Sequence, residues 1–262
     1  MPCTLEEDDT KKLPPTYNAM FYMAPTLWVG ITFELIIQIK RTPQRFGLWN
    51  RGQRYSVEIE HRPRTRPARP ISPCFDTILS TLKYVPDEWH QFSATLPAKN
   101  TGVESVNCTF LTPAVQTYGL EDAIPFHIQL SGPLGSLSLL VPDRLVMAVS
   151  LVRRTVVTVN GRTQWRNRSI GEGKVWAMPP PATASMDALG VYTDWEGEVR
   201  CTSEVRSGSF NIGVVAVQDY VLFALVPSGG TKAAFMPLQH LHPIRLVTDS
   251  WTEESWTHPL DI

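Results

Sequence analysis

A stretch of alternating apolar residues between Leu145 and Trp165 constrains the fold more than any other part of the sequence. Apolar side chains occupy every second position at its start, namely Leu145, Met147, Val149 and Leu151. This is the period of a β-strand, in which successive side chains point to opposite faces. Asn160 and Gly161 follow a β-branched run and predict a type I′ turn, because that turn needs positive φ at both central residues. We therefore expect a β-hairpin that returns through Thr163–Trp165.

Two arginines, Arg153 and Arg154, lie in the middle of this predicted strand. Neighbouring residues on a strand face opposite sides of the sheet. One of the two arginines must therefore face the core side, or a β-bulge must redirect it.

The remaining chain repeats the strand pattern. Further strands are expected at residues 28–41, 53–60, 89–96, 106–111, 124–130, 174–176, 194–200 and 241–247, and residues 209–226 should form two strands or one bent strand. The 22 prolines argue against long helices. Trp165, Trp176 and Trp195 are expected to pack within the sheets. The sequence thus predicts an all-β fold, with about seven strands in its second half at spacings typical of a β-sandwich.

Composition excludes several classes of function. The net charge of −1 gives no global field that would attract nucleic acid, so no nucleic-acid partner is expected. No stretch reaches the roughly 20 apolar residues of a membrane span, and the first residues lack the apolar segment of a signal peptide, so we expect a cytoplasmic protein.

No catalytic, metal-binding or cofactor-binding residues are predicted. The four cysteines (Cys3, Cys74, Cys108 and Cys201) are widely scattered, and Cys108 and Cys201 fall within predicted strands as small buried residues. His240 and His242 share a strand face, but no convincing third metal ligand lies near them in the sequence. Phosphate-binding loops and nucleophile motifs are absent from the sequence.

Several motifs then occur in a characteristic order. They are Ile124–Leu130, Val152–Arg154, Ile170–Gly173, Asp194–Glu198, Ser209–Phe210, Val217–Tyr220 and Pro243–Asp249. Together they resemble the C-domain of arrestin-like proteins of the fungal type, over roughly residues 123–250. Leu13–Tyr17 and the strand at 28–41 resemble the later part of an arrestin N-domain.

This resemblance implies immunoglobulin-like arrestin β-sandwiches, of which the C-terminal one is complete. The N-terminal one is expected to be partial. A full arrestin N-domain has several strands before the segment that Leu13–Tyr17 resembles, whereas only twelve residues precede Leu13 here. We expect an N-terminal polar segment at residues 1–19, a partial N-like domain at 20–118, a C-like sandwich at 119–250 and a tail at 251–262.

The resemblance also implies a function. We expect a non-enzymatic adaptor that binds membrane-protein tails, links them to a ubiquitin ligase or to endocytic sorting, and is recruited to the plasma membrane or endosomes by peripheral contact. The alternative is a structural subunit of a sorting assembly, similar to the arrestin-shaped component of retromer. A third class, an enzyme using cysteine or histidine, has no motif in its favour.

Two segments are candidate binding sites, and the first is Pro14-Pro15-Thr16-Tyr17. It fits the PPxY ligand of WW domains, in which the prolines preset polyproline II and the tyrosine ring enters a groove. In arrestin-related adaptors such motifs recruit HECT-type ubiquitin ligases. The alternative is a loop that leads into a strand, with Tyr17 packed in the fold.

The second segment is the basic, proline-rich stretch from Arg62 to Pro70. Its arginines (Arg62, Arg64, Arg66 and Arg69) are candidates for binding phosphate groups or a partner, as arginine clusters do in phospho-motif recognition. The stretch also loosely matches an SH3 ligand. The alternative is a solvated loop stiffened by proline.

Overall fold

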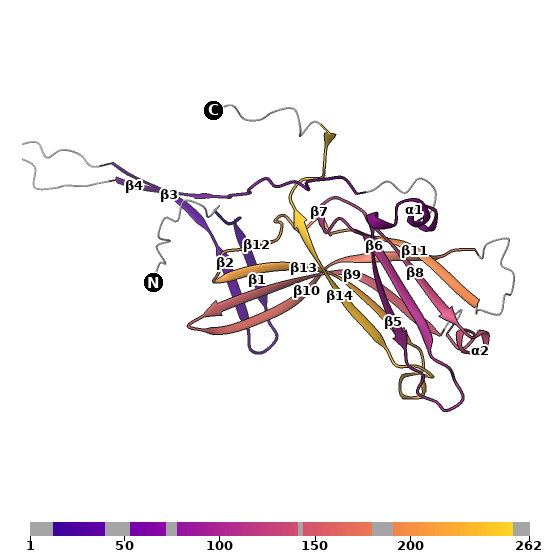
Figure 1. Cartoon of the computed structure of the whole chain (residues 1–262). Coiled ribbons are helices and arrows are strands. Elements are labelled where there is room, and N and C mark those ends of the chain that lie inside the picture. Colours follow the sequence, from indigo (N-terminus) through magenta and orange to yellow (C-terminus); the bar gives the residue numbers. More distant parts are fainter. Residues whose placement is uncertain (1–12, 40–52, 72–77, 141–143, 180–190, 254–262) are drawn as a thin grey trace, which may run out of the picture.

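The computed structural model describes residues 13–39, 53–71, 78–140, 144–179 and 191–253. The fold is all-β, as predicted (Figure 1). Residues 1–12 and 254–262, which hold most of the expected N-terminal segment and tail, lie outside the described residues.

The strands and short helices follow one another in this order. The first half contains β1 (Tyr17–Phe21), β2 (Leu27–Ile31), β3 (Phe33–Ile39), β4 (Gln53–Ile59), α1 (Ile78–Tyr84), η1 (Pro86–Glu88), β5 (Trp89–Leu96), β6 (Val106–Pro113) and β7 (Thr117–Gly119). The second half contains β8 (Ile124–Gly132), α2 (Leu134–Leu137), β9 (Leu145–Val159), β10 (Arg162–Ala177), β11 (Val191–Val199), β12 (Phe210–Asn211), β13 (Val215–Pro227), η2 (Gly230–Lys232) and β14 (Leu238–Val247).

One large sheet dominates the molecule. Its hydrogen-bonded order is β5-β6-β8-β11-β10-β9-β13-β14-β7, with β12 added beside β13. The sheet curls into two layers, because β10 belongs to both of them. Residues 162–172 of β10 pair with β9, whereas residues 173–177 pair with β11. The core therefore lies between the layer of β5, β6, β8 and β11 and the layer of β9, β13 and β14.

The expected boundary between residues 118 and 119 falls inside this sheet. β5 pairs with β6 along its whole length, and β6 pairs with β8 from Asn107↔Ser131 to Leu111↔His127. Residues 89–113 are thus strands of the same sheet as β8 to β14. The sequence pattern located these strands but carried no information on their partners, because strand pairing is a long-range property.

The predicted hairpin at Asn160-Gly161 is confirmed. Val159 pairs with Arg162, and both turn residues have positive φ (51° and 73°). The expected single strand at 28–41 is instead divided into β2 and β3, which have different partners. Residues 209–226 form the short β12 followed by the long β13.

β10 passes from one layer to the other at a β-bulge. Close packing of a ring on a glycine follows beyond the bulge. The register with β9 shifts between Ser169 and Gly171, so that Ile170 is the extra residue, and its side chain is buried. Beyond the bulge, β10 pairs with β11, and Gly197 of β11 lies directly beneath the ring of Phe126 in β8. A Cβ at position 197 would lie 2.1 Å from Cζ of Phe126 and 2.4 Å from the carbonyl oxygen of Lys174. Only glycine allows the ring of Phe126 to lie this close to the backbone of β11 and β10.

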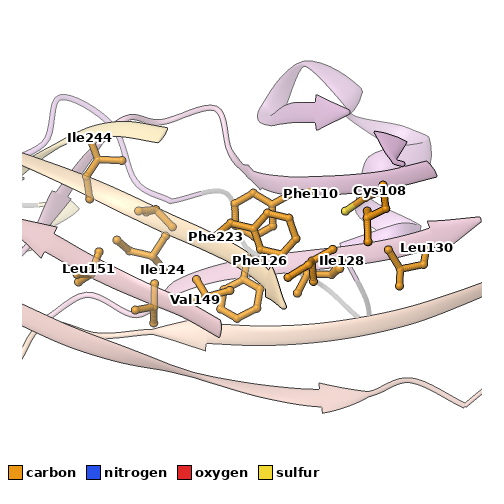
Figure 2. Packing of buried hydrophobic residues seen from close by; sticks show 14 of the residues in the cluster. Cys108, Phe110, Ile124, Phe126, Ile128, Leu130, Val149, Leu151, Phe223 and Ile244 are labelled. Carbon is orange, nitrogen blue, oxygen red and sulfur yellow. The ribbon is translucent and has the colours of Figure 1, made fainter. Parts of the chain in front are cut away.

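The core is formed by inward-facing residues of both layers (Figure 2). Phe110 of β6 stacks on Phe223 of β13, with ring centroids 4.4 Å apart, and this pair joins the two layers. Phe126 packs beside them, with its ring centroid 5.9 Å from that of Phe110. Cys108 lies in the same cluster and is fully buried, as expected for a small apolar residue.

The edge strand β5 and the first part of β14, which precedes its pairing with β7, nearly close the curled sheet. An isolated bridge joins Ala98 to Phe235. Beyond it the strands are linked by ring stacking: Phe92 lies on His240 at 3.6 Å and His90 on His242 at 4.3 Å between ring centroids. The Nε2 atoms of His240 and His242 are buried, and neither has a hydrogen-bond partner in the described part of the chain. Burial, with a smaller effect of the neighbouring imidazoles, lowers the pKa of His242 to about 4.

We expect Gly197→Ala to lower the free energy of unfolding by about 2–4 kcal/mol, because the new methyl group overlaps Phe126 and the backbone of β10. Urea unfolding of the purified variant measures this loss. Gly135→Ala in α2 is the matched control, since a Cβ there meets nothing within 4 Å. Equal unfolding curves for the two variants would contradict the close packing of the Phe126 ring on Gly197.

We expect the fold to lose stability as the pH falls from about 6.5 toward 4. The unfolded chain takes up a proton on His242 below 6.5, whereas the folded chain resists it down to about 4. The loss at the lower limit is therefore roughly 3 kcal/mol for this group. Urea midpoints at the two pH values measure it. His242→Phe retains a stacking ring without the titration, so its midpoints should change much less; an unchanged pH dependence in this variant would contradict the assignment.

Candidate protein-binding surface

The outer face of the sheet carries an aromatic and cationic patch on three neighbouring strands. Arg154 of β9 is flanked in register by Asn167 of β10 and Gln218 of β13. Trp165 and Tyr220 occupy the diagonal positions of the same two flanking strands. We call Arg154, Trp165, Asn167, Gln218 and Tyr220 the outer patch. Side chains at such diagonal positions are within reach of one another when they are long or aromatic.

The guanidinium of Arg154 lies over the rings of Trp165 and Tyr220, at 4.7 Å and 4.9 Å from their centroids. Its Nε donates a hydrogen bond to Oδ1 of Asn167 (3.1 Å). The hydroxyl of Tyr220 donates to Oε1 of Gln218 (3.0 Å). The patch is thus held in one arrangement before any partner arrives, although the side chain of Trp165 stays 52% exposed.

A hollow of about 390 Å³ adjoins the outer patch where β12, β13 and β14 meet. Gln218 and Tyr220 belong to both features, and Arg245 of β14 also lines the hollow. β13 pairs with β14 from Leu225 to Asp219 and then with β12. The hollow therefore lies where β12 replaces β14 as the neighbour of β13.

The unpaired charges of this surface are positive, because Asp219, which also lines the hollow, is paired with Arg153. Arg154 and Arg245 have no carboxylate within ion-pair distance among the residues that the structure describes. An acidic side chain from a partner would meet an unpaired guanidinium in each case, and charge-assisted hydrogen bonds of this kind are among the stronger ones.

The sequence reasoning did not find the outer patch. It expected Trp165 and Trp176 to pack within the sheets, but both are exposed. The Asn-Gly turn does fix the register that puts Asn167 opposite Arg154. The position of Tyr220 depends on pairing between β9 and β13, which no local pattern indicates.

The other mid-strand arginine, Arg153, faces inward and forms a buried ion pair. Its Nε and Nη2 donate to the two carboxylate oxygens of Asp219, at 2.7 Å and 2.9 Å. Ser209 donates a further hydrogen bond to Asp219 (2.7 Å). Burial opposes the charge of Arg153, but its hydrogen bonds and the charge of Asp219 outweigh burial and raise its pKa. The expected alternative of a bulge at this position is therefore not used.

The candidate WW ligand covers this ion pair. Pro14 and Pro15 are buried, and the carbonyl oxygen of Pro14 lies 2.8 Å from Nδ1 of His61. The hydroxyl of Tyr17 is hydrogen-bonded to Thr155 (2.8 Å), and its ring packs edge-on against Phe210. Burial raises the pKa of Tyr17, and the bond to Thr155 partly offsets this. A WW domain could reach both prolines and the tyrosine only after this segment left the fold.

Each of the four candidate phosphate-binding arginines has an acidic neighbour. Arg62 pairs with Glu60, Arg69 pairs with Glu88 at 3.4 Å, and Arg64 and Arg66 both reach Asp249, at 3.1 Å and 3.8 Å. The hydrogen bond to Asp249 raises the pKa of Arg64.

The backbone of this arginine segment is also fixed, since Asp249 N donates to the carbonyl of Thr65 and Thr65 N donates to Thr248. The segment is thus docked along the end of β14. Exposed ion pairs of this kind contribute about 1 kcal/mol or less, so a phosphate group could still compete for the guanidinium groups.

A buried polar group beneath α1 was also missed. Nε2 of His127 lies 3.1 Å from Asp194, which also accepts from Gln129 (3.0 Å). Glu196 accepts a hydrogen bond from the backbone of Ile78, the first residue of α1 (3.1 Å). Because its members hold α1 on the outer face of β8 and β11, we interpret this group as structural.

No group of three potential ligands in the described ranges is arranged to hold a metal ion. This includes the seam of His90, His240 and His242, where the rings stack on one another and on Phe92. Cys108 is buried, and Cys201 lies just after β11 rather than within a strand. Burial raises the pKa of these thiols to about 12 and about 11, so both stay protonated at neutral pH.

No family model matches the chain, and no curated protein is significantly similar to it. Neither α-helix within the described residues has the length and apolar character needed to cross a membrane.

We expect Tyr17→Ala to lower the free energy of unfolding by about 2–4 kcal/mol, because it removes a packed ring above Thr155 and Phe210. Thermal or urea unfolding measures the loss. Tyr22→Ala is the matched control in the same hairpin, because Tyr22 is 79% exposed, and its effect should stay within about 0.5 kcal/mol. Equal, small effects of both substitutions would instead indicate an accessible PPxY motif.

Proposed function

We propose that this chain is a non-catalytic, arrestin-like adaptor that binds the tails of membrane proteins and connects them to endocytic sorting or to a ubiquitin ligase. The all-β sandwich and the order of its motifs support the arrestin-like part of this proposal. The outer patch supports the part of the proposal that concerns binding of membrane-protein tails. In this view the protein works in the cytoplasm and is recruited to the plasma membrane or endosomes by its cargo.

The residue types of the outer patch favour protein recognition. Tryptophan, tyrosine and arginine dominate the binding energy of protein interfaces, and here one of each is already stacked in place. A binding surface that is ordered in advance loses less conformational entropy when the partner arrives. The outer patch therefore has the composition and the order of an interface centre.

The charges favour a cargo tail of defined chemistry. Arg154 and Arg245 attract acidic side chains, and the exposed ring of Trp165 offers an apolar contact on the same surface. A tail segment that combines acidic residues with an aromatic or branched apolar residue fits this surface, with the apolar side chain on Trp165 and a carboxylate at the hollow near Arg245.

The link to a ubiquitin ligase depends on Pro14, Pro15 and Tyr17. Because these residues are packed, ligase recruitment through a WW domain requires that the segment detaches and uncovers Thr155 and the Arg153–Asp219 pair. Sorting of cargo through the outer patch has no such requirement, so we favour it as the primary activity.

The alternative, a structural subunit of a sorting assembly, has one observation in its favour. The hairpin of β3 and β4 presents a row of exposed apolar residues and is paired with no other strand of the described chain. A subunit would use such a surface for contacts with other proteins of its assembly.

We expect Trp165→Ala and Arg154→Glu each to weaken binding of acidic membrane-protein tail peptides at least tenfold, which corresponds to about 1.4 kcal/mol or more. Fluorescence titration of a panel of labelled tails against the purified chain measures this. Trp176→Ala is the matched control: Trp176 lies on the same strand and is similarly exposed, but outside the outer patch. Tails that bind all variants equally, or that bind none, would refute the proposed binding role of the outer patch.

A further inference from the structure

The β3–β4 hairpin has two chemically different faces. Register places one set of seven apolar residues on the same face: Phe33, Leu35, Ile37, Ile39, Tyr55, Val57 and Ile59. All except Phe33 are large side chains with roughly half of their surface exposed. The opposite face holds polar residues, with Ile36 as an exception, and there Glu34 lies directly opposite Glu58. This alternation is typical of a sheet that is covered on one side only.

Nothing in the described chain covers the apolar face. β3 and β4 form a separate two-stranded sheet, and in Figure 1 the hairpin projects away from the two-layered body. An isolated two-stranded sheet is marginally stable in water, and an additional layer or strands are needed to stabilise it. The hairpin thus has the composition of one layer of a sandwich, with no second layer over it among the described residues.

The apolar face is complementary to itself. The seven apolar residues carry no charge, and the hydroxyl of Tyr55 donates a hydrogen bond to Oε1 of Gln53, which shares their face (3.2 Å). Two copies related by a twofold axis can therefore bring these apolar side chains together. The polar faces are less suited to such a contact, because among the paired residues of β3 and β4 each brings the two carboxylates of Glu34 and Glu58 and only one cation, Arg54, to offset them. The projecting position of the hairpin leaves room for the second body at the opposite end of the pair.

The available area is sufficient for a specific contact. Six half-exposed large side chains leave roughly 500 Å² of apolar surface on each hairpin. Two copies would together bury about 1,000 Å², which is near the lower limit for specific protein interfaces. Self-association of moderate strength is therefore expected.

We propose that the apolar face of the β3–β4 hairpin is a self-association surface, on which the same hairpin of a second copy packs with twofold symmetry. The surface is separate from the outer patch. The proposal is independent of the proposed adaptor function and does not depend on which cargo the protein carries.

Ile36 and Ile37 allow a sharp test. They are adjacent, of the same residue type and similarly exposed (40% and 48%), but they lie on opposite faces of β3. Sedimentation equilibrium of the full chain should show a reversible monomer–dimer equilibrium. Ile37→Lys should raise the dissociation constant of the dimer at least tenfold, whereas Ile36→Lys should leave it within about twofold. Circular dichroism and urea unfolding verify that both variants keep the folded body.

A second pair of variants tests the same face from the other strand. Val57→Lys should weaken the dimer as Ile37→Lys does, and Ser56→Lys should not, because Ser56 points to the polar face. A wild-type chain that is monomeric at all accessible concentrations would overturn the proposal, even if the hairpin bound a different protein. So would a dimer that lysine weakens equally at positions 36 and 37.

Discussion

The whole structure depends on a single strand that is shared by two layers. β10 pairs with β9 over its first part and with β11 over its second part, so the sheet must curl at the change of partner. The bulge at Ile170 supplies the bend, and Gly197 allows Phe126 to lie against the crossing strands. The curl then creates the enclosed space that Phe110, Phe126 and Phe223 fill. Without this crossing, the chain would form an open sheet with an exposed apolar face.

The same strands serve two purposes along their length. Near the crossing, β9 and β13 contribute Val149 and Phe223 to the core. Farther along, their inward face becomes polar, with the Arg153–Asp219 ion pair covered by Tyr17. Their outward face carries the outer patch at this same level. The outer patch and the buried ion pair thus lie on opposite faces of the same strands, with Arg154 and Arg153 as neighbours on β9.

The local parts of this fold could be predicted from the sequence. Alternation and the Asn-Gly turn gave the strands around residues 145–165, and the pattern of 124–130 and 241–247 gave β8 and β14 with small errors at their ends. Pairings between distant segments could not be predicted in the same way. The partner of Arg153 lies 66 residues away, and the packing of Tyr17 against Thr155 spans 138 residues.

The candidate site shows the same limit. Half of the outer patch follows from the register of one hairpin, but Tyr220 joins it only because β13 pairs with β9 over its whole length. Trp165 was expected inside the sheets because large aromatic residues are usually buried. A tryptophan that stays exposed beside a stacked arginine is therefore informative, although the sequence alone did not distinguish it from a core residue.

Amide hydrogen exchange resolved by residue tests the central claim most directly, namely that both layers form one sheet joined by β10. Amides of β6, β8 and β11 should then open with the same high free energy as those of β9 and β13, in a single cooperative unit. The two halves of β10 should be equally protected. Distinct opening free energies for the two layers, with a step in protection near Ile170, would contradict the account and indicate two separately folding units.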